Sequence, residues 1–176
     1  SSAASDVYKR QELKDHIRLL PLEEVPAELE WRTGMEEPEV GDPRAVKGGL
    51  VRLWINTPFP GTLRAFGPGS ETFFNYSAID NVWLPLVGLH PETFRPIPGL
   101  ADRWAVSADG KTVFYHLDPE ATYSDGRPVR AQDFLLNICL RTSGFARDPF
   151  WTTLFRSTYD QITVYGDSVI ALTLPS

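Results

Sequence analysis

The part of the chain that decides the fold lies between residues 98 and 129. It reads Pro98-Gly99-Leu100-Ala101-Asp102-Arg103-Trp104, then Ser107-Ala108-Asp109-Gly110-Lys111-Thr112, then Tyr123-Ser124-Asp125-Gly126-Arg127-Pro128-Val129. Each Asp-Gly pair is a turn signal, because Asp bonds its own backbone and Gly accepts a positive φ. After the first turn, Val113, Tyr115 and Leu117 alternate with Phe114, His116 and Asp118, which is the period of a strand. The stretch therefore predicts a strand pair around residues 109–110 and a helix that begins after Pro128.

Other segments on both sides of this stretch also have the patterns of regular structure. In chain order we expect a strand over Leu50–Ile55, a helix over Phe73–Leu84, an extended crossing over Pro91–Pro98, a helix over Ala131–Arg141 and a hairpin over Tyr159–Leu174 that turns at Gly166-Asp167. Arg130 stands directly before the start of that helix and cannot accept hydrogen bonds from its first N–H groups, which weakens the helix start by about 1 kcal/mol. The fold class expected is α/β, with mixed α+β character.

Residues 1–46 form an acidic leader that proline residues interrupt. Between Gln11 and Asp42 there are ten acidic and three basic residues, a balance of −7, which leaves +1 for the rest of a chain whose net charge is −6. Basic residues do not gather on one face, so no nucleic-acid partner is expected. Glu12–Leu20 has the spacing of a short helix, and Trp31 is a candidate to hold the leader to the body. We expect the leader to be largely irregular, a reading that we prefer over a dedicated partner-binding segment.

The order of these motifs resembles one family, the bacterial extracellular solute-binding proteins of the peptide/nickel class (family 5), which serve ABC importers. The similarity extends beyond residues 98–129. Further matching motifs are Lys47-Gly48-Gly49-Leu50-Val51-Arg52-Leu53, Leu86-Val87-Gly88-Leu89-His90-Pro91, Ile162-Thr163-Val164 and Val169-Ile170-Ala171-Leu172-Thr173-Leu174. Several motifs in one order are more specific than any single one.

The resemblance implies a periplasmic binding protein-like class II fold. It suggests the first strand of the large lobe plus the small extra subdomain of this class, within an N-terminal fragment. On this interpretation residues 1–46 are the leader, and residues 47–176 are the N-terminal part of a solute-binding domain whose second lobe is missing.

The resemblance also indicates where a ligand would lie. In relatives the loop after the first strand faces the cleft, which here is Asn56-Thr57-Pro58-Phe59. Asn56 and Thr57 would bond ligand amides, Phe59 would cover an apolar side chain, and Pro58 lacks a backbone donor. An ordinary turn with a buried Phe59 is an equally good interpretation. Trp151, beside Phe150 and Phe155, would line the approach to the cleft, although packing is the commoner role of an aromatic residue.

The sequence gives little support to an enzyme. The three histidines, His16, His90 and His116, have no metal-ligand spacing, and no serine lies in a nucleophile motif. Asp125 and Asp133 are close in sequence, but turn and helix-start roles explain both more simply than a glycosidase pair. Cys139 is expected to be a packed thiol. No cofactor and no metal is expected.

The function implied is capture of a peptide-like solute and its delivery to an ABC permease in the inner membrane. A periplasmic location, or a lipid anchor outside the cytoplasmic membrane, follows from the same resemblance, and a monomer is expected. Two alternatives stay open. In the first, the cargo is a nickel chelate, haem, a sugar or an antibiotic peptide instead of a nutrient peptide. In the second, the chain is the ligand-sensing domain of a regulator. A hydrolase that uses Asp125 is a more distant third.

Overall fold

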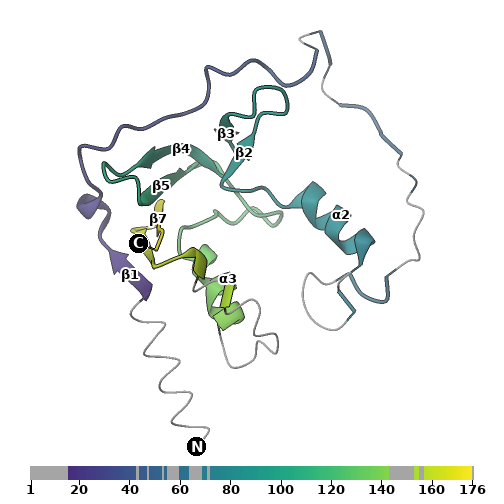
Figure 1. The fold of residues 1–176 in the computed structure, drawn as a ribbon. Helices are drawn as coiled ribbons and strands as arrows, with labels where there is room; N and C mark the ends of the chain where they lie inside the picture. The colour runs from purple at the N-terminus through teal and green to yellow at the C-terminus, as the bar shows by residue number, and fades with distance from the viewer. Residues whose placement is uncertain are drawn as a thin grey trace, which may run out of the picture.

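A five-stranded mixed sheet forms the body of the protein. The computed structural model describes residues 16–42, 44–46, 48–52, 54, 60–63, 69–70, 72–142, 153–154 and 157–175. The strands of the sheet, in spatial order, are β1 (Ile17–Leu20), β6 (Gln161–Tyr165), β7 (Val169–Thr173), β5 (Thr112–Leu117) and β4 (Ala101–Val106). Only the β1–β6 pair in this sheet is parallel, and the other three pairs are antiparallel. Figure 1 shows this sheet beside the helices α2 (Phe73–Val82) and α3 (Asp133–Thr142).

The two hairpins predicted from the sequence are confirmed. β4 and β5 pair around the turn at Asp109-Gly110, where Gly110 has a φ of 72° and its N–H donates to Ser107 O at 2.9 Å. Asp109 Oδ1 accepts hydrogen bonds from the Ser107 hydroxyl at 2.6 Å and from the Lys111 N–H at 3.0 Å. β6 and β7 pair in the same way around Gly166. The turn chemistry read from the sequence thus fixes both hairpins.

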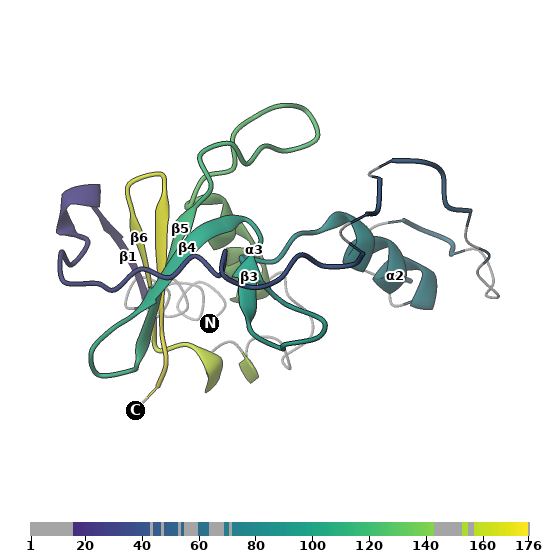
Figure 2. The same ribbon diagram turned by 90° about the horizontal axis from the view of Figure 1, so that it is seen from above.

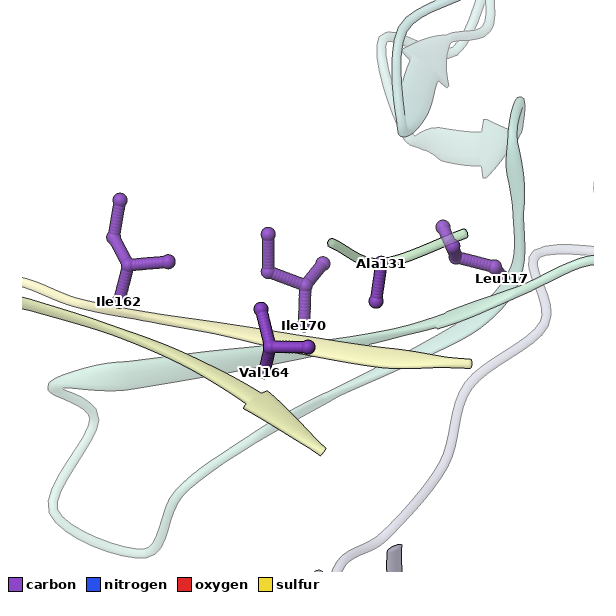
Figure 3. Close-up of a cluster of buried hydrophobic side chains, with 5 residues drawn as sticks. All are labelled: Leu117, Ala131, Ile162, Val164 and Ile170. Carbon is purple, nitrogen blue, oxygen red and sulfur yellow. The ribbon is translucent and has the colours of Figure 1, made fainter. Parts of the chain in front are cut away.

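One face of the sheet carries the first of two apolar clusters. It consists of Leu117, Ala131, Ile162, Val164 and Ile170, and Phe134 and Leu135 of α3 pack against it. Figure 3 shows these five side chains gathered between the strands and the start of the α3 segment. Ile162 and Ile170 are about 1% exposed. Successive residues of a strand point to opposite faces of the sheet. The strand residues that alternate with the members of this cluster therefore belong to the other face.

The second cluster lies on that other face, and the leader covers it. Ala105, Phe114, Tyr165, Val169 and Ala171 are buried there against Leu20, Val25, Leu29 and Trp31. The expectation of a helix over Glu12–Leu20 is therefore wrong for Ile17–Leu20, which is strand β1. Parallel pairing with β6 satisfies the backbone of these residues and overrides their helical spacing. The role expected for Trp31 is confirmed.

The segment before β4 forms a small second sheet. β2 (Val87–Leu89) pairs antiparallel with β3 (Pro96–Pro98) across the turn His90–Arg95. The extended crossing predicted over Pro91–Pro98 is thus confirmed for Pro96–Pro98 and wrong before them, where the chain turns and Phe94 has a φ of 56°. In Figure 2, α2 lies to one side of the five-stranded sheet, beyond β3.

The strand expected over Leu50–Ile55 is not seen in the part of it that the structure describes. Leu50, Val51, Arg52 and Trp54 have no ladder partner there, and Leu50, Val51 and Trp54 are 78–83% exposed. A strand needs a neighbour to satisfy its backbone groups, and no described segment lies beside this one.

The two predicted helices are confirmed, with shifted ends. α2 stops at Val82, and α3 runs from Asp133 to Thr142. Asp133 Oδ2 accepts the Arg130 N–H at 2.9 Å, which is one of the two hydrogen bonds of a capping box. The other would need a hydrogen-bond acceptor in the side chain of residue 130, which Arg130 lacks. Cys139 is exposed, which corrects the packed thiol expected from the sequence.

Candidate ligand-binding region

All five predicted ligand contacts, Asn56, Thr57, Pro58, Phe59 and Trp151, lie outside the described residues. The region is therefore defined by the described residues on either side of them. Trp54 precedes the first four and is 83% exposed, whereas Pro60, directly after them, is buried. An exposed aromatic residue followed by a fixed anchor is suitable for presenting a short segment to a ligand.

The anchor on the C-terminal side is built around Asn75. This side chain is 2% exposed, and its Nδ2 donates to Thr62 O at 2.9 Å and to Ser70 O at 2.8 Å. Thr72 Oγ1 accepts the Asn75 N–H at 3.2 Å, as an N-cap side chain does at the third helical residue. The first turn of α2 thus holds residues 62 and 70 together.

Sequence reasoning missed this anchor. Asn75-Tyr76-Ser77 has the pattern of a glycosylation triplet, but the amide of Asn75 is buried and both of its hydrogens are engaged. The signal that would have found it is Thr72-x-x-Asn75 at a helix start, directly after a loop rich in Gly and Pro.

The described residues that follow Trp151 also form a local anchor. Leu154 O accepts hydrogen bonds from the Ser157 hydroxyl at 2.9 Å and from the Thr158 hydroxyl at 2.7 Å. This arrangement ties residue 154 to the start of the segment that enters β6. Trp151 therefore lies three residues before a fixed carbonyl, although its own position is not described.

A polar contact joins the leader to the β2–β3 turn. His90 is 1% exposed, and its Nδ1 accepts hydrogen bonds from the N–H groups of Glu92 and Thr93, each at 3.2 Å. Because Nδ1 is an acceptor, Nε2 carries the proton and donates it to Pro38 O at 3.0 Å. Glu37 accepts the Thr93 hydroxyl at 2.7 Å and contacts Arg95 at 3.4 Å. The Thr93 hydrogen bond, followed by the Arg95 contact, lowers the pKa of Glu37 against the opposing effect of desolvation.

A second contact of the leader involves charged and aromatic groups. The Arg103 guanidinium lies 5.5 Å from the ring centroid of Trp31, and the His116 ring meets Trp31 edge-on at 6.3 Å. Asp102 Oδ1 lies 2.8 Å from His116 Nδ1. His90 and His116 are thus both held in structural contacts, as expected of isolated histidines.

The carboxylates near the second Asp-Gly turn also have local partners. Asp125 accepts the Arg127 N–H at 3.1 Å and the Arg127 Nε at 2.8 Å, while Asp133 accepts the Arg130 N–H. These are the turn and helix-start roles preferred from the sequence. The pKa of Tyr123 is raised, first by burial of its hydroxyl and second by the hydrogen bond with Asp133.

Within the described residues there is no group of three or more metal-ligating side chains, and no helix is long and apolar enough to cross a membrane.

Comparison with known families gives one match. Residues 95–175 match the family "Bacterial extracellular solute-binding proteins, family 5 Middle". The matched segment contains β3, β4, β5, α3, β6 and β7, and hence most of the five-stranded sheet. Over these residues the chain is similar to a family of solute-binding proteins, and the resemblance inferred from the sequence is confirmed there. No curated protein matches the chain.

Solved structures with a similar fold belong to the same class of protein. A periplasmic oligopeptide-binding protein from Borrelia burgdorferi is 20% identical with a TM-score of 0.51, and covers 60% of this chain and 24% of its own. The murein tripeptide-binding protein from Escherichia coli is 22% identical with a TM-score of 0.50, and covers 66% of this chain and 25% of its own. The chain spans about a quarter of the length of these structures. Its mixed sheet with few short helices therefore matches part of a periplasmic binding protein.

Proposed function

We propose that the chain is part of a substrate-binding component of an ABC importer that captures a peptide-like solute and delivers it to a membrane permease. The observation that carries this proposal is the family-5 match over residues 95–175. Two solved structures of similar fold are those of an oligopeptide-binding protein and a murein tripeptide-binding protein. A periplasmic or lipid-anchored location outside the cytoplasmic membrane is part of the same proposal.

The fold proposed in finer detail is the beginning of the large lobe together with the small extra subdomain. The division into a leader over residues 1–46 and a solute-binding part over residues 47–176 stays a prediction, although β1 of the leader pairs with β6 across that boundary. In this arrangement the chain supplies one wall of a cleft, and closure of a second lobe over the ligand supplies the other.

The residues proposed to meet the ligand are Asn56, Thr57, Pro58, Phe59 and Trp151. Asn56 and Thr57 would hydrogen-bond the ligand main chain, and Phe59 and Trp151 would cover apolar side chains. Two described features support this role for the first four residues. Trp54, two residues before Asn56, is exposed, and Asn75 fixes Thr62 shortly after Phe59.

Amide chemical shifts, measured while ligands are titrated into the 15N-labelled chain, test the proposal. The ligands are dipeptides to pentapeptides, with nickel–histidine, haem and a simple sugar as the alternative cargoes. Because one wall makes only part of the contacts, we expect binding weaker than about 1 mM, an affinity of no more than about 4 kcal/mol. The shifts should be confined to residues 54–60 and the neighbourhood of Trp151.

A pair of variants makes the test specific. Phe59→Ala should abolish the peptide-dependent shifts, whereas Phe94→Ala, which removes an aromatic residue that is exposed on the β2–β3 turn, should leave them unchanged. If the shifts saturated only with a non-peptide cargo, that cargo class would replace the peptide as the proposed ligand. Micromolar binding of any ligand by this chain would contradict the one-wall arrangement, and shifts at other residues would contradict the proposed site.

A further inference from the structure

The leader residues 16–38, which we call the arm, are docked on the body along their whole described length. β1 pairs with β6 from Ile17–Ile162 to Leu20–Tyr165, and Gly166 N–H donates to Leu20 O at 2.9 Å. Leu20, Val25, Leu29 and Trp31 cover the second apolar cluster. Arg32 and Trp104 then exchange two backbone hydrogen bonds, at 2.8 and 2.9 Å.

The arm ends in the polar contact described above. Glu37 meets Thr93 and Arg95, and Pro38 O accepts from His90. All of these contacts of the arm are made to residues between 90 and 171, which are far away in the sequence. None of them depends on the chain that links residue 38 to the body.

The described residues directly after the arm lack the packing contacts that the arm makes with the body. Val40, Val46, Leu50, Val51 and Trp54 are all more than 60% exposed. Gly41, Gly48 and Gly49 have positive φ values, and a Cβ added at any of them would meet no atom within 4 Å. Residues 39–54, which we call the connector, span at most about 50 Å when extended.

A docked arm on a long unpacked connector is the architecture in which two copies can exchange the same element at little cost. We propose that the β6 edge and the second apolar cluster form a docking surface for the arm of a second copy of this chain. In the exchanged dimer each arm makes the same contacts that it makes in the monomer, now across the two chains. This inference concerns the arm and is independent of the proposed ligand-binding role.

Concentration decides between the two states. A connector of this length holds the arm at an effective concentration on the order of 1 mM beside its own body. Below that concentration the arm docks on its own chain, which agrees with the monomer expected from the sequence. Near 1 mM and above, the arm of a neighbouring chain competes, and dimers should form.

A cysteine pair across β1 and β6 tests the proposal. Arg18 is exposed and faces Thr163 in the parallel register, and neighbouring strands lie about 4.8 Å apart, within the range that a disulfide bridges. The full chain would carry Arg18→Cys and Thr163→Cys, with Cys139→Ser to remove the exposed native thiol. Oxidation at about 10 µM should give cross-linked monomer, and oxidation after incubation at about 1 mM should give covalent dimer as more than half of the product.

A second cysteine pair is the matched control. Val106→Cys and Val113→Cys face each other across the short β4–β5 turn, in a hairpin that does not exchange. This pair should form cross-linked monomer at every concentration. Covalent dimer from this pair as well, or cross-linked monomer from the β1–β6 pair at both concentrations, would overturn the proposal.

The unmodified chain gives an independent measurement, which does not depend on the folding of a cysteine variant. A 1:1 mixture of 15N-labelled and unlabelled chains is held at about 1 mM, diluted to about 10 µM and followed by native mass spectrometry. Exchanged dimers should include the mixed species and decay over minutes or longer, because dissociation requires the arm to undock. Dimers that vanish within the dead time of dilution would indicate a surface contact instead, for example through the exposed apolar side chains of α2, and would overturn the proposal. Absence of dimers would do the same.

Discussion

At the scale of single residues, two positions in the arm show how closely it fits the body. Gly34 has a φ of 64°, and a Cβ added there would lie 2.6 Å from Pro96 O and 2.8 Å from Trp104 Cη2. Glu37 has a side chain that is 6% exposed and bonded to Thr93 and Arg95. One position admits only glycine, and the other is a carboxylate with a defined set of partners.

The substitution Gly34→Ala should therefore destabilise the protein. Left-handed backbone strain costs about 1–2 kcal/mol, and overpacking against Pro96 and Trp104 adds a similar amount, so a loss of about 3 kcal/mol is expected in denaturant unfolding. Gly41→Ala is the control, because Gly41 has a φ of 98° but no atom within 4 Å of the added Cβ. It should cost about 1 kcal/mol. Equal losses in the two variants would contradict the close packing at Gly34.

The contribution of Glu37 should depend on pH. Its pKa is lowered in the folded state, so its contacts stabilise the protein fully above its ordinary value of 4.5 and are lost as the pH falls through the folded pKa. At pH 7 the free energy of unfolding of Glu37→Gln should be smaller than that of the wild type, and the difference should shrink as the pH falls below 4.5. Chemical unfolding at several pH values measures it. The exposed neighbour Glu36, replaced as Glu36→Gln, should show no such trend, and a constant difference for Glu37→Gln would contradict the assignment.

At the scale of elements, α2 is the element whose role was least visible in the sequence. Among its described side chains, Phe73, Tyr76 and Val82 are exposed, whereas the polar Asn75 is buried. The buried amide of Asn75 organises the loop that precedes the helix. Apolar spacing predicted the existence of the helix but not the side that it buries.

Removal of the Asn75 amide should loosen that loop. Asn75→Ala leaves the carbonyls of Thr62 and Ser70 without this donor and should cost about 2 kcal/mol. Asn75→Asp should cost more, because a carboxylate would face both carbonyl oxygens. Amide hydrogen exchange should accelerate at the described residues of 60–72, while β6 and β7 stay protected. If the aspartate variant were as stable as the wild type, the two hydrogen bonds would not be the anchor.

The elements that the sequence predicted well are those with local signals. The β4–β5 and β6–β7 hairpins follow from Asp-Gly and Gly-Asp turns beside alternating strands, and α3 follows from Pro128 and Asp133. β1 could not be predicted in this way, because its partner β6 lies more than 140 residues away and Ile17–Leu20 also has helical spacing. The predicted ligand contacts came from family resemblance, not from a local pattern, and they stay predictions.

At the scale of the whole molecule, the sheet is covered on one face by α3 and on the other by the arm. The arm precedes the family segment of residues 95–175, yet Leu20, Val25, Leu29 and Trp31 complete the second cluster. Composition suggested an irregular leader, because this part of the chain is acidic and is interrupted by proline residues. These four apolar residues of the leader nevertheless pack against the sheet.

Trp31→Ala should therefore affect the whole molecule. Loss of a partly buried indole that also contacts Arg103 and His116 should lower the free energy of unfolding by about 3 kcal/mol. Trp54→Ala is the matched control, since it removes an indole that is 83% exposed, and it should change stability by less than about 0.5 kcal/mol. Thermal unfolding followed by circular dichroism compares the two. A small effect of Trp31→Ala would mean that the arm contributes little to the core.

The parallel β1–β6 pair has a consequence for how the chain reaches its native state. His16 and Asp160 are 144 residues apart, so at typical rates of translation the first strand waits on the order of ten seconds before its partner is synthesised. Closing so large a loop is entropically costly, and the nearby β4–β5 and β6–β7 hairpins can form first. We therefore expect β1 to dock last, onto an edge that the rest of the sheet has already built. A newborn chain would expose that edge to other newborn chains during the interval, most of all on crowded polysomes.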